Sequence, residues 1–152
     1  MSNIFPPFSV NTPPPQQPMI TDIPNVPAFA QLLTTNQGLI ILKFGAEWCG
    51  PCKKIAPLVD DWFSKINTNP TIQCGIIDID DNIELYGFLK TKKRVNGVPV
   101  IMCFDKGNTS YISNDIVMGS NPQEVNAFFM RCMQRLKLAN LPGGGDNMIV
   151  NK

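Results

Sequence analysis

The sequence predicts an α/β fold in which a central mixed β-sheet is covered by helices on both faces. Short apolar runs of strand length alternate along the chain with longer segments whose apolar residues recur at helical spacing. The clearest case is the apolar run at 39–44, followed after a short turn by an amphipathic segment that starts at Cys52. With 152 residues, 43% of them hydrophobic, the chain has enough apolar material for one domain with its own core.

The first elements of the domain are expected to run strand, helix, strand. A short strand is predicted near 19–21. A helix is predicted around 28–35, where Phe29, Leu32 and Leu33 recur on one face. The apolar run that precedes the two neighbouring cysteines is the next strand.

The segment after Cys52 predicts a long helix. Its apolar positions are spaced for one helical face: Ile55, Ala56, Val59, Trp62, Phe63 and Ile66. Pro57 lies inside this segment, so a kink is expected there. A strand at 72–79 and a short helix at 83–89 follow.

The C-terminal part predicts two more strands and a final helix. The strands, at 100–104 and 111–116, are separated by a turn rich in Asp, Gly and Asn. Asn121 is a capping residue, Pro122 suits the first helical position and Glu124 completes a capping box. The helix then presents an apolar stripe of Val125, Phe128, Phe129, Cys132 and Leu136.

The composition changes at both ends of the predicted domain, which we place at 19–140. Residues 1–18 are rich in proline, which favours an extended conformation, and we expect a flexible or surface-draped arm. Alternatively, the arm docks on a proline-recognising partner or mediates self-association with a second copy, because its apolar side chains could fill a groove. A glycine-rich flexible tail is predicted at 141–152.

Charge and hydropathy limit the function classes. A formal net charge of +1 argues against nucleic acid or another polyanion held by bulk electrostatics. No apolar run reaches membrane-spanning length, so no membrane association is expected. The first residues lack the basic region and apolar stretch of a signal peptide, so we expect the cytoplasm or another reducing compartment.

The most informative motif is the pentapeptide Trp48-Cys49-Gly50-Pro51-Cys52. It lies between a predicted strand and a predicted helix. Cys49 therefore faces unpaired backbone N–H groups and the positive end of the helix dipole, and both stabilise a thiolate. The two-residue gap lets the two thiols close a small disulfide. This arrangement favours thiol–disulfide exchange.

Two other roles for the cysteine pair have less support. A metal site needs about four ligands, whereas the chain has no histidine and a single Cys-x-x-Cys pair. A purely structural disulfide usually closes a longer loop in a cysteine-dense secreted domain. The remaining cysteines, Cys74, Cys103 and Cys132, are isolated in the sequence and are expected to be small buried hydrophobic residues.

Residues 44–57, which include the pentapeptide, resemble the active-site segment of thioredoxins. Val98-Pro99 and the apolar strand after it are similar to the cis-proline and following strand of that family. Gly119 stands where thioredoxins carry a glycine that faces the active site. The similarity spans roughly residues 19–138, and it implies a thioredoxin fold and an enzyme that reduces protein disulfides.

The resemblance implies a role for each thiol. Cys49, expected to be the more exposed, would attack a disulfide in a protein substrate, and the more buried Cys52 would resolve the mixed disulfide. Gly50-Pro51 adds no charge between them and implies a reducing potential of about −270 mV. No cofactor is expected beyond the Cys49–Cys52 disulfide, because electrons would come from an external thiol or flavin reductase.

The resemblance also implies a shallow apolar substrate groove around the nucleophile, lined by Trp48, Gly50, Pro51, Val98, Pro99 and Gly119. If the Val98–Pro99 bond is cis, the Val98 backbone would be free to pair with an extended substrate segment. Core packing is the alternative role for these side chains.

Lys43 is a departure from the family pattern, because thioredoxins carry a buried aspartate at this position beneath the cysteines. The lysine that often accompanies that aspartate is also missing, with Ile76 as its nearest match. Two interpretations follow. Lys43 extends to solvent and leaves the site apolar, or its ammonium lies close enough to favour the thiolates.

Three functions stay open from the sequence. The first is a reductase of protein disulfides, and the second is a disulfide oxidase or isomerase on the same fold. The third is an interaction module for which the cysteines are dispensable.

Overall fold

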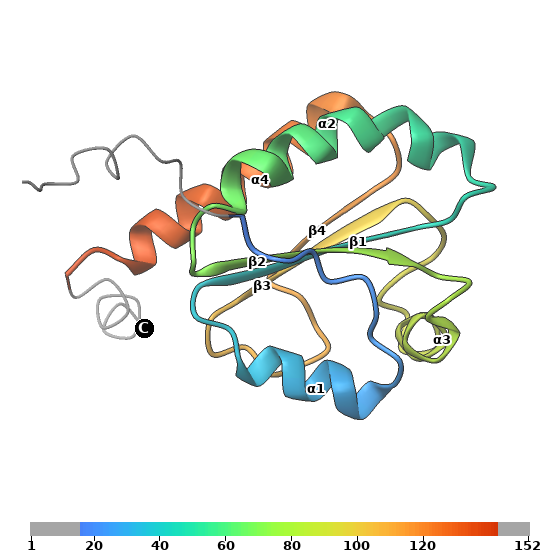
Figure 1. Cartoon of the computed structure of the whole chain (residues 1–152), viewed down its shortest axis with the longest axis horizontal. Helices are drawn as coiled ribbons and strands as arrows, with labels where there is room; N and C mark the ends of the chain where they lie inside the picture. Colours follow the sequence, from blue (N-terminus) through green and yellow to red (C-terminus); the bar gives the residue numbers. More distant parts are fainter. Residues whose placement is uncertain (1–15, 143–152) are drawn as a thin grey trace, which may run out of the picture.

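The computed structural model of the chain describes residues 16–142, in which a four-stranded sheet lies between two layers of helices (Figure 1). The elements are α1 (Val26–Thr34), β1 (Leu39–Gly45), α2 (Gly50–Ile66), β2 (Ile72–Asp78), α3 (Ile83–Thr91), β3 (Val100–Asp105), β4 (Asp115–Met118) and α4 (Pro122–Ala139). The strand order is β2-β1-β3-β4; β1 runs parallel to β2, and the other neighbours are antiparallel. Helices α2 and α4 cover one face and α1 and α3 the other, so the predicted fold class is confirmed.

Strand β1 is the centre of the domain because it pairs on both edges and is buried on both faces. Its side chains alternate between two cores, as in any strand. Leu39 and Ile41 pack with the residues of α2 and α4, whereas Ile40, Leu42 and Phe44 pack with those of α1 and α3. By the same alternation, Lys43 faces α2.

Helix α2 carries the apolar face that its sequence predicts. Ile55, Val59, Phe63 and Ile66 are buried against the sheet and α4. Trp62 stacks on Phe129 of α4, with ring centroids 5.1 Å apart. The helix is continuous through Pro57.

Two predicted strands differ from the structure. The strand predicted near 19–21 is a single parallel bridge between Ile20 and Gly75. It is held by two backbone hydrogen bonds and follows Pro18, which cannot donate to a ladder.

The strand predicted at 111–116 is wrong in its boundaries, because β4 begins at Asp115. In the segment before β4, asparagine side chains form the hydrogen bonds that a strand would form through its backbone. The Asn108 amide donates to the carbonyl oxygen of Ile112 and to Asn114 Oδ1, which also accepts from the N–H of Asp105. These local bonds form an irregular loop in place of a ladder.

Of the predicted N-terminal arm, only the last three residues lie in the described part of the chain. Gln17 is attached to the domain, where its amide donates to the carbonyl oxygens of Asn69 and Ile72 at 2.6 and 2.9 Å. Residues 1–15, and the tail from residue 143 on, lie outside the described residues.

Candidate active site

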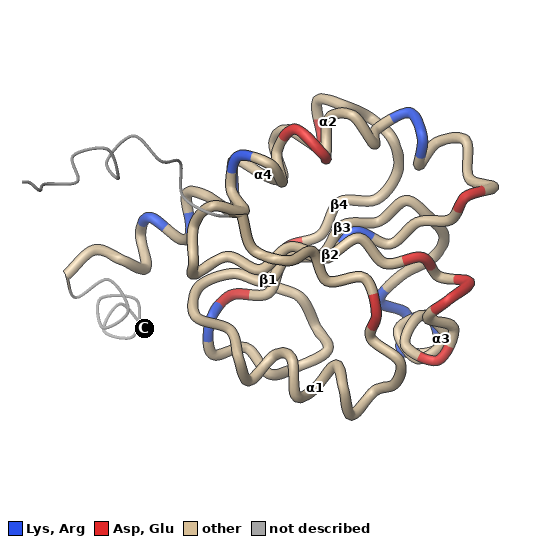
Figure 2. The backbone as a smooth tube through the Cα atoms, viewed as in Figure 1, with Lys and Arg blue, Asp and Glu red and all other residues tan. Residues whose placement is uncertain are grey.

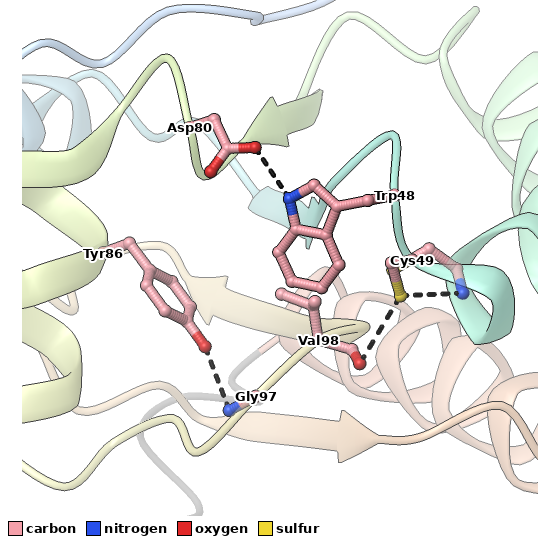
Figure 3. The surroundings of a disulfide bond; sticks show 7 residues. Trp48, Cys49, Asp80, Tyr86, Gly97 and Val98 are labelled. Atoms are coloured by element: carbon pink, nitrogen blue, oxygen red, sulfur yellow. Dashed lines mark hydrogen bonds between the residues drawn. A yellow bond between two sulfur atoms is a disulfide. The ribbon is translucent and has the colours of Figure 1, made fainter.

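The two cysteines of the pentapeptide lie where β1 gives way to α2, as predicted, and they form a disulfide. Cys49 is the N-cap of α2, and its Sγ accepts a hydrogen bond from the N–H of Cys52 at 3.1 Å (Figure 3). Its sulfur therefore lies at the positive end of the helix dipole, where negative charge is stabilised.

The predicted contrast in exposure between the two thiols is wrong for the disulfide form. Cys49 is 4% exposed and Cys52 is 5% exposed. The loop that contains Val98 covers Cys49, whose Sγ lies 3.7 Å from the Val98 carbonyl oxygen. What distinguishes the two sulfurs is their surroundings, because Cys52 faces β1: a Cβ added at Gly45 would lie 3.4 Å from its Sγ.

The Val98–Pro99 peptide bond is cis, as the family resemblance implied. The loop before it is held by the Tyr86 hydroxyl, which accepts a hydrogen bond from the N–H of Gly97 at 2.9 Å (Figure 3). After it, the N–H of Gly119 donates to the Pro99 carbonyl oxygen at 2.9 Å. Gly119 has φ +90°, a backbone conformation that favours glycine.

Trp48 projects from the surface next to the disulfide and is 68% exposed. Its indole N–H donates to the Asp80 carboxylate at 2.8 Å (Figure 3). The surface around it is acidic: a hollow of about 650 Å³ is lined by Glu47, Trp48, Asp78, Asp80 and Asp81. Figure 2 shows acidic segments gathered near the start of α3.

The sequence reasoning missed Asp80 and Tyr86. A signal for Asp80 was present, because the acidic run at 78–81 follows β2, which neighbours β1. The carboxyl ends of adjacent parallel strands meet at one edge of a sheet, and Asp78 is paired with Gly45.

Lys43 is 6% exposed, so its side chain does not extend to the surface. The interpretation in which Lys43 reaches solvent is therefore wrong. It lies between Ile76 of β2 and Ile101 of β3. It lines a pocket of about 300 Å³ together with Cys52. Burial lowers the pKa of Lys43, and the nearby Asp60 carboxylate opposes this without reversing it.

The comparisons with known proteins agree with this geometry. The family model named Thioredoxin matches residues 21–130. The chain belongs to the thioredoxin family.

Relatives and solved structures give the extent of the similarity. The chain is 34% identical to thioredoxin of Pseudomonas aeruginosa over 85 residues, which are 53% of this chain and 69% of that protein. It is 32% identical to thioredoxin of Chlamydia pneumoniae over 74 residues, which are 47% of this chain and 63% of that protein, or just under two thirds of its length. The Fasciola hepatica thioredoxin structure superimposes with a TM-score of 0.57 and 26% identity, over 74% of this chain and 98% of that one.

Family membership and the disulfide at the active-site position make the chain a dithiol–disulfide oxidoreductase. Among residues 16–142, no group of three or more His, Cys, Asp or Glu side chains is arranged to hold a metal ion. Within the same residues, no helix combines the length and the apolar character needed to cross a bilayer.

The other three cysteines of this thioredoxin-family chain are free and buried, as predicted. Burial raises the pKa of the Cys74 thiol to about 12. A hydrogen bond with Cys132, together with burial, raises the pKa of Cys103 far above its ordinary value. Both thiols are therefore poor nucleophiles at neutral pH.

Proposed function

We propose that the chain reduces disulfides in other proteins, with Cys49 as the nucleophile and Cys52 as the resolving thiol. The observation that carries the proposal is the position of the Cys49 sulfur at the N-cap of α2, where it accepts the N–H of Cys52. A separate thiol or flavin reductase would return the disulfide to the dithiol, in a reducing compartment such as the cytoplasm.

In the first step, the Cys49 thiolate attacks one sulfur of the substrate disulfide. A mixed disulfide forms between Cys49 and that sulfur, and the other substrate sulfur leaves as a thiolate. The N–H of Cys52 and the dipole of α2 favour the attacking thiolate over the thiol at neutral pH.

The substrate is held by the surface around Cys49. Val98 is half-buried and its carbonyl oxygen lies beside the Cys49 sulfur, which supports a role for its backbone in pairing with an extended segment of a substrate. The exposed Trp48 ring offers apolar surface on the other side. Gly50, Pro51 and Gly119 are exposed and leave room for the substrate chain.

In the second step, Cys52 attacks the Cys49 sulfur, so that the disulfide re-forms and the reduced substrate leaves. Cys52 is the second residue after Gly50 in α2 and faces β1. The first attack is assigned to Cys49 because its sulfur accepts the N–H at the helix N-terminus.

A second candidate, a disulfide oxidase or isomerase, is favoured by Lys43. A cation near the pair stabilises thiolates, and hence the reduced form, which makes the disulfide more oxidising. Equilibration with glutathione buffers separates the two: about −270 mV supports the reductase, and about −180 mV supports oxidation or isomerisation.

The test of activity is the reduction of a disulfide-containing protein such as insulin by the chain with a dithiol as electron donor. We expect Cys49→Ser to abolish it and Cys74→Ala, which removes a buried thiol elsewhere, to retain it. Full activity of Cys49→Ser would show that Cys49 is not the nucleophile, and a wild-type rate no higher than that of the dithiol alone would support an interaction module. Self-association through residues 1–18 stays a prediction, which the sedimentation of the full chain would check.

A further inference from the structure

Lys43 is the one charged side chain that is buried among residues 16–142. None of the ion pairs in this part of the chain includes it; they are formed by Lys65, Arg131 and Arg135. Burying an unpaired ammonium costs free energy. Its position beside the Cys49–Cys52 pair therefore indicates a role in the chemistry of that pair.

The backbone of β1 places Lys43 within reach of Cys52. Lys43 and Gly45 are two residues apart and therefore lie on one face of the strand, with Cβ positions about 7 Å apart. The Cys52 sulfur lies next to the second of these positions, because a Cβ at Gly45 would be 3.4 Å from it. The four-carbon stem of lysine can span most of the remaining distance.

Helix α2 leaves space between the side chains of Lys43 and Cys52. Cys52, Ala56 and Asp60 recur at intervals of four residues and share the helix face above Lys43. Because Ala56 is small, the lysine and the cysteine open on the same pocket of about 300 Å³. That volume admits water molecules between them.

Four other charged groups line this pocket or lie near it. Asp60 of α2 lies near the lysine and favours its protonated form. Glu47, Lys53 and Asp78 line the rim from the preceding loop, α2 and β2. Burial lowers the pKa of Lys43 more than the Asp60 carboxylate raises it, so this pKa lies below 10.5. The neutral amine therefore forms more readily than in an exposed lysine.

We propose that Lys43 accepts the proton of the Cys52 thiol, directly or through one water molecule, when Cys52 resolves the mixed disulfide. This rests on the proposed function and assigns a base to its second step.

The Lys43 amine takes the Cys52 proton and becomes an ammonium, which stabilises the new thiolate. The Cys52 thiolate attacks the Cys49 sulfur; the Cys49–Cys52 bond forms, and the bond from Cys49 to the substrate sulfur breaks. The substrate sulfur leaves as a thiolate and takes a proton from solvent, while the Lys43 ammonium returns its proton to water in the pocket. Two electrons pass from the dithiol to the substrate, and no other oxidant or reductant is needed.

The test isolates the second step. The mixed disulfide between Cys49 and thionitrobenzoate is formed at acid pH, where Cys52 stays a thiol. The solution is then stepped to a series of higher pH values. Release of the coloured thiol reports resolution by Cys52 alone. The buried thiols Cys74 and Cys103, whose pKa values are raised, do not compete.

Lys43→Met removes both the charge and the base, whereas Lys43→Arg keeps a charge that cannot lose its proton. We expect both to slow resolution at neutral pH by about a hundredfold or more, the lower end of the range for one general base. Lys54→Met, which removes an exposed lysine of α2, should leave the rate unchanged. A wild-type rate of resolution in Lys43→Arg would show that a fixed positive charge is sufficient. A wild-type rate in Lys43→Met would show that the lysine takes no part in resolution. Either result overturns the proposal.

Asp60→Asn gives a second measurement, the pH midpoint of resolution. This midpoint would not change if Lys43 had only a structural role. Without the carboxylate, the pKa of Lys43 falls further, so the pH midpoint of resolution should shift downward. In a Lys43→Met background the same change should have no effect. An unshifted midpoint overturns the proposal, whereas failure of wild-type Cys49 to form the mixed disulfide at all overturns the proposed function itself.

Discussion

The chain holds two neighbouring pairs of buried cysteines, and their difference shows what makes a thiol reactive. Cys49 and Cys52 are 4% and 5% exposed, and Cys103 and Cys132 are 0% exposed, so burial separates the pairs only slightly. At the first pair a backbone N–H at a helix N-terminus donates to the sulfur. At the second pair the Cys103 thiol is itself a donor, to the Asp105 carboxylate at 3.9 Å, and Cys132 together with burial raises its pKa. Reactivity follows the donors that face the sulfur more than the depth of the residue.

A cation lies beside each pair, and the two cations also differ. Arg135 is 3.8 Å from the Cys132 sulfur and is paired with Asp105 and Asp115 at 3.0 and 2.9 Å. Lys43 has no such partner and faces a pocket. A cation whose charge is satisfied by carboxylates is a structural group, whereas an unpaired one is available for chemistry.

The largest effect that would test this comparison is on catalysis. Cys49→Ser should reduce the rate of protein disulfide reduction to that of the dithiol alone, because no other described thiol lies at a helix N-terminus. Cys132→Ala should keep the rate, although it leaves a cavity that lowers the free energy of unfolding by about 1–2 kcal/mol. Insulin reduction and chemical denaturation measure the two effects. A rate lost in both variants would show that the second pair is redox-active.

The next effect concerns the ion pairs at the second site. Burial alone would raise the pKa of Asp115, but hydrogen bonds from Arg131 and Arg135 outweigh it and hold the pKa below 3.8. A carboxyl with a lowered folded pKa stabilises the fold above its unfolded pKa, and this contribution is lost as pH falls through the folded pKa. Asp115→Asn should therefore lower the free energy of unfolding at neutral pH by about 2 kcal/mol, and the difference should vanish in acid.

Denaturant titrations across pH check this prediction, with Asp61→Asn as the matched control. Asp61 pairs with Lys65 at 3.0 Å, but both side chains are mostly exposed, so the control should change stability little. Equal effects of the two substitutions would mean that the pairing of Arg135 has no structural role.

At the active site, burial of a charged group has the opposite effect on stability. The pKa of Lys43 is lowered on folding, so its ammonium destabilises the fold, and this penalty develops as pH falls below the unfolded value of 10.5. Lys43→Met should raise the free energy of unfolding at neutral pH by about 1 kcal/mol or more. The gain should disappear as pH rises past that value. A loss of stability in Lys43→Met, against an unchanged Lys54→Met, would mean that the lysine is well solvated or paired.

The sequence predicted the parts of this site that depend on neighbouring residues. The strand-to-helix junction at Cys49 follows from a local pattern. The sequence left two positions open for the Lys43 side chain, and only the packing of α2 on β1 decides that it is buried. The hydrogen bond between Trp48 and Asp80 joins residues 32 positions apart and depends on the packing of β1 beside β2.

Long-range contacts also explain the other differences from the sequence predictions. The equal burial of the two active-site cysteines depends on the loop between α3 and β3, which is distant in sequence, so no local pattern encodes it. Arg135 meets Asp115 only because α4 packs against β4. At β4, side-chain hydrogen bonds of two asparagines replace the ladder that the local pattern favours.

The smallest effect is expected at the exposed contact between Asp80 and Trp48. Asp80→Ala removes the acceptor of the indole N–H, but both partners are exposed and water replaces the lost bond. The KM for a protein disulfide should rise by no more than about threefold, the net value of one exposed hydrogen bond, and kcat should stay the same. Asp81→Ala is the matched control, because Asp81 lines the same acidic hollow but the indole N–H donates to Asp80. A tenfold or larger rise in Asp80→Ala alone would mean that the orientation of Trp48 governs substrate binding, and that the first cysteine pair depends on its surface as much as on the helix N-terminus.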